Sequence, residues 1–218
     1  MKRIVLITMM TLGLSACAVT PQHGISELNL SQTKALIRAY HESGAYTAET
    51  SRVAREARDY LDERLSKGVT KPAIVFDVDE TLISNYPYIN KDVDFGYIAR
   101  LQKEWEGRAE APPIEPVRDL CRYAISKGVT VFIITARPEQ QRASTSLNLK
   151  RAGCDNYKQM YLRSDPKEDS AEYKTSKRRE ISKSGYTILV NIGDQESDLR
   201  GGYAERGFKL PNHFYLIP

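Results

Sequence analysis

The sequence has 218 residues and a formal net charge of +4, from 32 Lys and Arg against 28 Asp and Glu. Its 41% hydrophobic and 28% charged residues are ordinary for a globular protein, which excludes collagen, low-complexity disorder and a multi-span membrane protein. At about 100–200 residues per domain, this length allows one decorated domain or two small ones. Three cysteines are too few for a disulfide scaffold.

Residues 1–16 have the organisation of a secretory signal peptide. Lys2 and Arg3 precede an apolar stretch, residues 4–14, that is too short to span a bilayer as a helix. The stretch ends in Leu-Ser-Ala-Cys, which resembles the lipobox of bacterial lipoproteins and predicts lipidation of Cys17. The alternative is an ordinary signal peptide cut nearby. Removal of Lys2 and Arg3 leaves 30 − 28 = +2 with scattered basic residues, so we expect no nucleic-acid polymer as a partner.

The residues after this cysteine predict a location in the bacterial cell envelope. Residues 17–30 are polar and are interpreted as a tether between the lipid anchor and the folded protein. Ala18, rather than aspartate, follows the cysteine, which favours the outer membrane by the sorting pattern of enteric bacteria.

Residues 31–71 form an N-terminal helical segment. From Ser31 to Ser66 apolar residues recur on one helical face and charged residues on the other. Gly44 is a candidate break between two helices. We interpret the segment as packing against the core, with no part in the chemistry.

From residue 72 to residue 218 the pattern changes to short apolar runs separated by helical segments. The runs have strand length and cover residues 73–78, 129–135, 157–162, 187–192 and 214–217. The helical segments end at Gly128, Gly153 and Gly185, where glycine allows a left-handed end to the helix. Apolar strands alternating with helices predict a doubly wound α/β domain, whose parallel sheet has helices on both faces.

Acidic residues gather where these strands end, the edge at which such sheets bind ligands. Asp77 and Asp79 follow the first strand, and their i, i+2 spacing directs both carboxylates to one side. Asp194 and Asp198 follow the fourth strand. Like charges held this close are unfavourable unless a cation lies between them. The pattern therefore predicts a metal site.

The second strand end and the helix before the fourth strand add groups that suit an anion. Thr135 offers a hydroxyl, and backbone N–H groups from Ala136 onward are predicted to precede a helix. Cations are supplied by Lys174, Lys177, Arg178 and Arg179. Carboxylates with phosphate oxygens are typical Mg²⁺ ligands, and a carboxylate beside the metal can be a nucleophile, so a phosphate monoester fits every part. A Ser-His-Asp hydrolase is excluded because there is no G-x-S-x-G, and no Cys/His cluster has zinc spacing.

These residues resemble a known family. Asp77-x-Asp79-x-Thr81, Thr135, Lys174 and Gly193-Asp194-x-x-x-Asp198 are similar, in order and spacing, to the four motifs of haloacid-dehalogenase (HAD) superfamily phosphatases. FDVDETLISN (76–85), GDQESDL (193–199) and FKLPNHFYLIP (208–218) further resemble the class B acid phosphatases of subfamily IIIB. That group includes plant acid phosphatases, vegetative storage proteins and bacterial lipoprotein acid phosphatases. The resemblance covers residues 33–218 and implies a HAD-like, Rossmann-like sheet.

The resemblance implies a role for each matching carboxylate. Asp77 is expected to be the nucleophile and a Mg²⁺ ligand. Asp79 is expected to protonate the leaving oxygen, then to activate the hydrolytic water, while its backbone carbonyl binds the metal. Asp194 is expected to ligate Mg²⁺, and Asp198 either ligates it or holds its water.

Phosphate binding is expected from a second set of residues. The resemblance assigns it to Thr135, Ala136 and Lys174, with Lys174 neutralising developing charge. Lys177 and Arg178 are alternatives for the cationic role.

Residues 84–113 form an insertion where this superfamily places a small cap over the site. Tyr88 and Trp105 are candidates for stacking on an aromatic part of the substrate. The alternative is that this aromatic-rich insertion packs on itself.

Two cysteines remain after Cys17. Cys121 belongs to an apolar series with helical spacing, so we expect it to be a packed core thiol rather than half of a bridge to Cys154.

The predicted function is a Mg²⁺-dependent acid phosphatase that acts on phosphate monoesters, 5′-nucleotides among them, through an aspartyl-phosphate intermediate. One alternative is a non-catalytic storage or binding lipoprotein on the same fold. Another is a phosphotransferase, because the same intermediate serves transfer to an alcohol. Relatives form dimers or tetramers, which implies a homo-oligomer.

Overall fold

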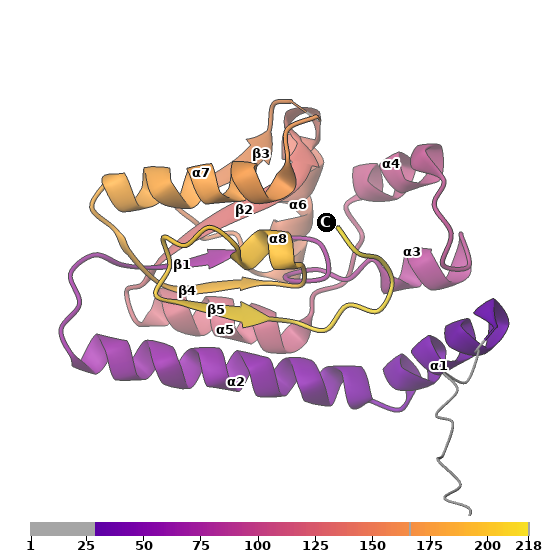
Figure 1. Ribbon diagram of the computed structural model, residues 1–218, viewed down its shortest axis with the longest axis horizontal. Helices are drawn as coiled ribbons and strands as arrows, with labels where there is room; N and C mark the ends of the chain where they lie inside the picture. Colours follow the sequence, from indigo (N-terminus) through magenta and orange to yellow (C-terminus); the bar gives the residue numbers. More distant parts are fainter. Residues whose placement is uncertain (1–28, 166, 218) are drawn as a thin grey trace, which may run out of the picture.

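A parallel sheet forms the centre of the computed structural model, which describes residues 29–165 and 167–217. Within them, five strands lie in the order β3-β2-β1-β4-β5 (Figure 1). They are β1 (Pro72–Phe76), β2 (Thr130–Pro138), β3 (Gln159–Arg163), β4 (Thr187–Gly193) and β5 (Arg206–Lys209), and every neighbouring pair is parallel. The prediction of a doubly wound α/β sheet is confirmed. The predicted signal peptide, Cys17 and all but the end of the tether lie outside the described residues.

Helices cover both faces of this sheet (Figure 1). One face packs against α7 (Ser170–Lys183), and the other against α2 (Ala45–Ser66), α5 (Glu115–Ser126) and α6 (Arg142–Ala152). The alternation of side chains along β1 explains both layers, because Val75 lies in the core under α7 while Ile74 and Phe76 lie in the core under the other three helices. Such a strand is apolar at every position because neither face meets water.

The helical lead-in consists of two helices. The first, α1 (Leu30–Glu42), begins with a capping box: Asn29 accepts a hydrogen bond from the backbone N–H of Gln32, whose side chain accepts one from Asn29. Gly44 separates α1 from α2 with φ +82°, a conformation that glycine adopts without steric cost, so the predicted break is correct. The inner face of α2 is buried through Val53, Ala57 and Leu61. No helix among the described residues is long and apolar enough to cross a bilayer.

The fifth strand is not where the sequence predicts it. Residues 214–217 are irregular, and the strand is Arg206–Lys209. This edge strand buries only Phe208, so it has no apolar run to detect. The apolar residues after this strand do not join the sheet. Phe214 stacks on His41 with ring centroids 5.0 Å apart, whereas Leu216 is 76% exposed.

Cys121 and Cys154 form a disulfide, so the expectation of a free core thiol is wrong. Cys121 lies on α5, and Cys154 follows Gly153, which ends α6 with φ +80°. The two helices cover the same sheet face, and the Cα atoms of the cysteines are 6.2 Å apart, within the range of a disulfide. Helical spacing predicts that Cys121 is buried, but it does not report which residue lies opposite.

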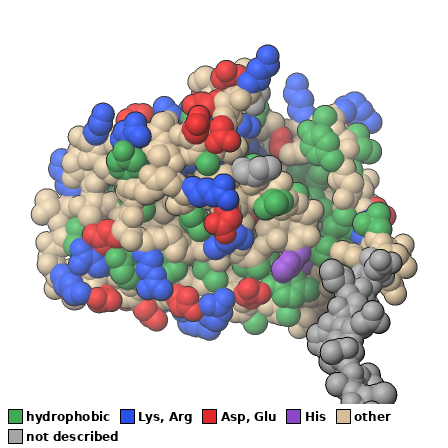
Figure 2. Space-filling model, in the orientation of Figure 1, with side chains coloured by type: hydrophobic (Ala, Val, Ile, Leu, Met, Phe, Trp, Pro, Cys, Tyr) green, Lys and Arg blue, Asp and Glu red, His purple; other side chains and the backbone are tan. Residues whose placement is uncertain are grey.

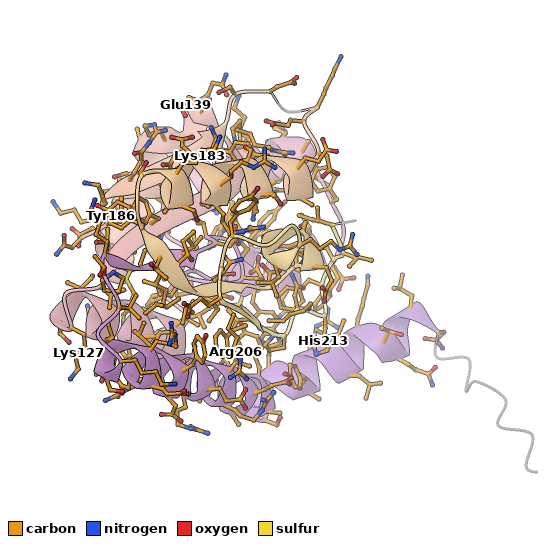
Figure 3. The ribbon with its side chains drawn as sticks, turned by 60° about the vertical axis from the view of Figure 1, so that its left-hand side comes forward. Lys127, Glu139, Lys183, Tyr186, Arg206 and His213 are labelled. Carbon is orange, nitrogen blue, oxygen red and sulfur yellow. A yellow bond between two sulfur atoms is a disulfide. The ribbon has the colours of Figure 1, made fainter. Side chains whose placement is uncertain are left out.

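The insertion after β1 carries two helices, α3 (Tyr86–Lys91) and α4 (Ala99–Arg108), and α1 lies beside it (Figure 1). Lys34 and Arg38 of α1 both pair with Asp94 in the insertion. His213 lies against α1 (Figure 3), where its ring meets Tyr40 edge-on with centroids 4.9 Å apart. Lys/Arg and Asp/Glu side chains are interspersed over the face seen in Figure 2, without a patch of one sign.

Candidate active site

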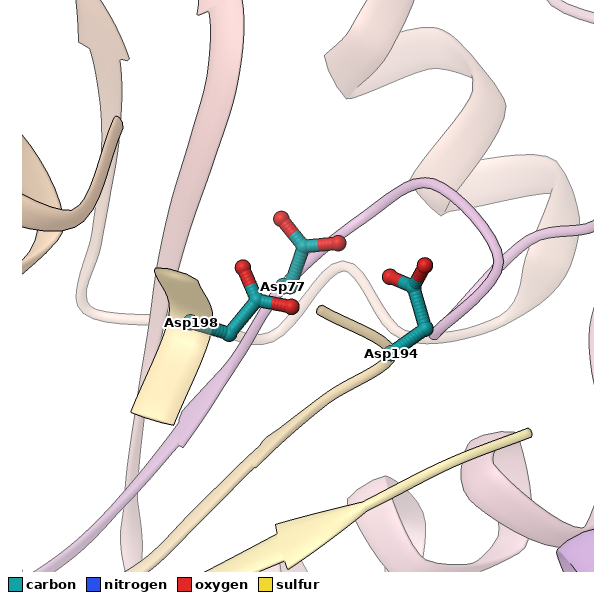
Figure 4. A group of neighbouring side chains, drawn as sticks. All are labelled: Asp77, Asp194 and Asp198. Atoms are coloured by element: carbon teal, nitrogen blue, oxygen red, sulfur yellow. The ribbon is translucent and has the colours of Figure 1, made fainter. Parts of the chain in front are cut away.

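Three buried carboxylates meet at the carboxyl ends of two adjacent strands. Asp77 follows β1, Asp194 follows β4, and Asp198 lies on the short helix α8 (Glu196–Leu199). One oxygen of each lies within 4.8 Å of the others, and the three side chains point in the same direction in Figure 4. Asp77, Asp194 and Asp198 are called the three-carboxylate group below. The structure thus brings together three of the four predicted metal ligands.

Lys174 is the cation at the three-carboxylate group. From α7, its Nζ donates to Asp77 Oδ1 at 2.6 Å and to Asp198 Oδ1. The alternatives lie elsewhere, since Lys177 pairs with Glu180, and Arg178 donates to the backbone carbonyl of Asp198 at 2.6 Å. Of the three candidate cations, the structure places Lys174 where the predicted role requires it.

The charges of this group are unbalanced. Three carboxylates and one ammonium carry a net −2 when all are ionised. Burial, together with Asp198 and Asp194, raises the pKa of Asp77 well above its ordinary value although Lys174 opposes the shift. Burial and Asp198 raise the pKa of Asp194 to about 7. Both shifts express the unfavourable crowding of buried negative charge, which a bound cation would relieve.

Gly193, at the end of β4, is required by close packing within this loop. A Cβ atom at this position would lie 2.5 Å from Cβ of Asp198 and closer still to its carboxylate. Asp198 is held in place by the backbone N–H of Gln195, which donates to Oδ2 at 2.8 Å. Any side chain at residue 193 would therefore displace a member of the three-carboxylate group.

Asp79 has different partners. Its carboxylate accepts two hydrogen bonds from the guanidinium of Arg137, at 2.7 and 2.9 Å, and one from Asn85 Nδ2 at 2.8 Å. These three residues are called the Asp79 group below. Burial alone would raise the pKa of Asp79, but Arg137 outweighs burial and lowers it. The Asp79 carboxylate is outside the three-carboxylate group, and the metal contact predicted for this residue is through its backbone carbonyl instead.

The predicted phosphate-binding residues of β2 are buried or half-buried. Thr135 is 1% exposed, and its hydroxyl accepts the backbone N–H of Arg137 at 3.2 Å, which leaves the hydroxyl proton for another acceptor. Arg163 holds the carbonyl of Ala136 at 2.9 Å. The predicted helix begins later than expected, because β2 runs to Pro138 and the 3₁₀ turn η1 (Glu139–Gln141) precedes α6. The role of Thr135 and Ala136 in binding phosphate stays a prediction.

Tyr88 and Trp105 are buried, with 5% and 8% of their surfaces exposed. Their rings stack on each other with centroids 5.9 Å apart, and Trp105 Nε1 donates to Asn85 Oδ1 at 2.7 Å. In this structure neither ring is open to a substrate, so the substrate-stacking interpretation is replaced by the alternative of an insertion that packs on itself. The bond to Asn85 also connects the insertion to the Asp79 group.

Several polar residues of the site were not predicted. Arg137 and Asn85 contact Asp79 directly, and Glu80 is fully buried with φ +51°. Burial and Asp79 raise the pKa of Glu80 to about 7, against hydrogen bonds from Asn85. Arg137 is two residues past the predicted Thr135, a signal that could have been used. Asn212 donates to Asp194 Oδ2 at 2.7 Å from a segment with no predicted chemistry.

The site combines four features: a parallel sheet, a carboxylate pair after its first strand, a lysine from a covering helix and a second acidic loop. Together they define a HAD-type phosphatase. The comparison with protein families is more specific. A sequence model of the acid phosphatase family, HAD superfamily subfamily IIIB, matches residues 3–218. The chain belongs to this family and is a phosphoric monoester hydrolase.

Known relatives include enzymes and proteins named for storage. Acid phosphatase 1 of Solanum lycopersicum is 32% identical over 193 residues, which cover 83% of this chain and 73% of the relative. Vegetative storage protein 1 of Arabidopsis thaliana is 30% identical over 203 residues, 88% of this chain and 74% of the relative. A solved class C acid phosphatase from Bacillus anthracis, with tungstate bound, aligns with a TM-score of 0.73, 28% identity and 87% coverage of each chain.

Proposed function

We propose that this protein is a Mg²⁺-dependent acid phosphatase that hydrolyses phosphate monoesters, 5′-nucleotides among them, through an aspartyl-phosphate intermediate. One observation carries the proposal: three buried carboxylates converge with a single lysine to balance them. Such an excess of negative charge suits a divalent cation and, through it, a phosphate dianion.

The donor set fits Mg²⁺. Asp77, Asp194 and Asp198 offer only carboxylate oxygens, the hard ligands that Mg²⁺ binds together with water and phosphate oxygens. A bound Mg²⁺ would supply charge neutralisation for the phosphate and for these carboxylates. Thr81 supports the arrangement from the loop after β1, because its hydroxyl lies 3.4 Å from Asp194 Oδ1.

The residues around Asp77 suit two displacements at phosphorus. In the first, an Asp77 oxygen forms a bond to phosphorus while the ester P–O bond breaks and the leaving oxygen takes a proton from Asp79. In the second, a water oxygen bonds to phosphorus and gives a proton to Asp79 while the bond between phosphorus and the Asp77 oxygen breaks, which releases inorganic phosphate and restores Asp77. Lys174 contacts Asp77 at 2.6 Å, where it can stabilise charge on the transferred phosphoryl group.

The Asp79 group suits an enzyme that works in acidic solution. The Arg137 ion pair lowers the pKa of Asp79 and favours the ionised form, which is the form needed to accept a proton from water. The protonated form needed for the leaving oxygen is populated as the solution becomes more acidic. Tungstate bound to the Bacillus anthracis relative is also consistent with the proposal, because tungstate is a tetrahedral oxyanion like phosphate.

The experiment measures phosphate release from an aryl phosphate and a panel of nucleotides, with and without a chelator. Asp77→Asn is expected to lower kcat on the order of 10⁴-fold or more, because the nucleophile is lost. Asp119→Asn is the matched control, since Asp119 is a surface aspartate whose side chain is 63% exposed. Full activity of Asp77→Asn, or activity of the wild type that does not depend on a metal, would contradict the mechanism.

The storage-type relatives favour a second candidate, a non-catalytic storage or binding protein on the same fold. Asp77 and its partners are intact here, which favours the enzyme. The same assay separates the two, because a storage protein would release no phosphate from any substrate of the panel. Adding an alcohol and looking for a new phosphate ester tests phosphotransfer.

The proposed location is the bacterial envelope, with the chain anchored through a lipid on Cys17. This proposal is supported by the sequence pattern of residues 1–17 alone. Its test is the full-length Cys17→Ser variant, which is expected to move from the membrane fraction to the soluble periplasmic fraction. An unchanged distribution would contradict lipid anchoring at this residue.

A further inference from the structure

The segment after β5 returns to the site. Residues 211–217 leave the sheet edge, run past the carboxyl ends of the strands and continue into the space between α8 and the insertion (Figure 1). Leu210, at the start of this path, donates its backbone N–H to the carbonyl of Gly193 at 2.9 Å. The segment therefore lies beside the loop that carries Asp194.

Two amide side chains hold one oxygen of Asp194. Asn212 Nδ2 donates to Asp194 Oδ2 at 2.7 Å, and Gln195 Nε2 donates to the same oxygen at 2.5 Å. Rotation of the carboxylate about its Cβ–Cγ bond would break both hydrogen bonds. The two amides thus fix the direction in which the other oxygen points.

The same segment fixes the orientation of both amides. Asn212 Oδ1 accepts the backbone N–H of Phe214 at 2.7 Å, and Gln195 Oε1 accepts the backbone N–H of Ile217 at 2.9 Å. Because each amide oxygen is used by the backbone, each NH₂ group is directed to Asp194. Tyr215 anchors the segment on the other side, where its hydroxyl donates to Glu80 Oε2 at 2.9 Å.

We propose that residues 212–217 are a positioning element of the metal site, in which Asn212 acts through Asp194 to set the affinity for the divalent cation. Groups that hydrogen-bond to a metal ligand orient it, and losing one such contact typically weakens metal binding about 10–100-fold. The inference rests on the proposed metal site, and it assigns a function to a segment that contributes no ligand of its own.

The test is calorimetric titration of the metal-free protein with Mg²⁺. Asn212→Ser retains an oxygen that can accept the Phe214 N–H, but its hydroxyl is too short to reach Asp194. We expect the Kd for Mg²⁺ to rise about 10–100-fold. Leu216→Ala is the control, because Leu216 belongs to the same segment and is 76% exposed.

The outcomes separate this inference from the proposed function. If the wild type binds Mg²⁺ and the Kd of Asn212→Ser is within about twofold of the wild-type Kd, the positioning role is overturned but the metal site is not. A wild type that binds no Mg²⁺ overturns the metal site and the inference with it. Thermal unfolding of the metal-free proteins verifies folding, and if Asn212→Ser does not fold, Gln195→Met removes the other amide donor and is expected to weaken Mg²⁺ binding similarly.

Discussion

The two sides of the active site hold negative charge in opposite ways. In the three-carboxylate group, Lys174 pairs with Asp77 and Asp198, and Asp194 has only uncharged hydrogen-bond donors among the described residues. In the Asp79 group, one carboxylate accepts two hydrogen bonds from the guanidinium of Arg137 and one from the side-chain amide of Asn85. The pKa directions follow, since those of Asp77 and Asp194 are raised and that of Asp79 is lowered.

This difference teaches how neighbouring aspartates, two residues apart in the sequence, can serve different chemistry. The three-carboxylate group keeps an excess of negative charge after Lys174 is counted, so it suits a bound cation. The Asp79 group is already neutral as a pair, so a cation would gain little there and a proton can be exchanged instead. The partners of each carboxylate, and not its residue type, set its use.

The largest expected effect comes from exchanging the two kinds of aspartate for asparagine. Asp79→Asn is expected to lower kcat about 10²–10⁴-fold because the acid and base are lost, while Mg²⁺ affinity changes little. Asp194→Asn is expected to weaken Mg²⁺ binding by more than about 100-fold, which is the upper value for losing a residue that only hydrogen-bonds to a metal ligand. Steady-state kinetics and calorimetry measure both. A stronger loss of Mg²⁺ binding in Asp79→Asn than in Asp194→Asn would break the comparison.

The next effect in size is structural and lies away from both groups. Replacing Cys121 and Cys154 by alanine removes a cross-link between residues 33 apart and is expected to lower the free energy of unfolding by about 2–4 kcal/mol. Urea unfolding followed by the fluorescence of Trp105, the only tryptophan, measures it. Because neither group contacts the bridge, kcat and KM are expected to stay unchanged, and a large fall in kcat would contradict the separation of scaffold and site.

Removing the cation of the Asp79 group is expected to raise the pKa of Asp79, as the pKa values of Asp77 and Asp194 are raised. Arg137→Met removes the main group that opposes the effect of burial on Asp79, so the pKa of Asp79 is expected to rise and the corresponding limb of the kcat against pH profile to move to higher pH. The free energy of unfolding is expected to fall by about 2–3 kcal/mol, less than for a wholly enclosed pair because the Asp79 side chain is 23% exposed.

A surface pair provides the control for this variant. Arg142 pairs with Glu139, and both side chains are nearly half exposed, so Arg142→Met is expected to change stability by less than about 1 kcal/mol. An unmoved pH profile in Arg137→Met would show that Arg137 does not control Asp79.

The smallest effect concerns acid sensitivity outside both groups. Burial, with His213 nearby, lowers the pKa of His41 to about 4, so the folded protein keeps this ring neutral while the unfolded chain takes up a proton near pH 6.5. This contribution to stability is present above about pH 6.5 and is lost as the pH falls toward 4.

His41→Phe retains the stacking on Tyr86, whose ring centroid is 3.9 Å away, and removes the titrating group. The fall in Tm between pH 7 and pH 5 is expected to be about 2 °C smaller in the variant, because His41 is partly exposed and its shift is correspondingly screened. An equal fall in both proteins would place the acid sensitivity in other groups.

Much of the site could be predicted because parallel strands end at one edge. Asp77 and Asp194 follow apolar runs whose carboxyl ends must meet, and Lys174 falls where the family pattern places it. The partners of these residues could not be derived in the same way. Arg137 is 58 residues from Asp79 and Asn212 is 18 from Asp194, and each contact depends on the path of an irregular segment that no periodicity reports.

The errors in the fold have the same cause. β5 is an edge strand with one buried side chain, so hydrophobic patterning selected the apolar run after it. The disulfide depends on which helices lie side by side on one sheet face. Of the two interpretations of the aromatic insertion, the structure favours packing of the insertion on itself, because Tyr88 and Trp105 are buried and stack on each other.

The lack of space at Gly193 bears on how active and storage members of this family can be told apart. We expect a relative that keeps every aspartate of the three-carboxylate group to be inactive if residue 193 carries a side chain, because one added methyl group would overlap Asp198. Counting carboxylates is therefore not a sufficient criterion for activity. Gly193, a position with no functional group of its own, is therefore a second residue to inspect, beside the nucleophile Asp77.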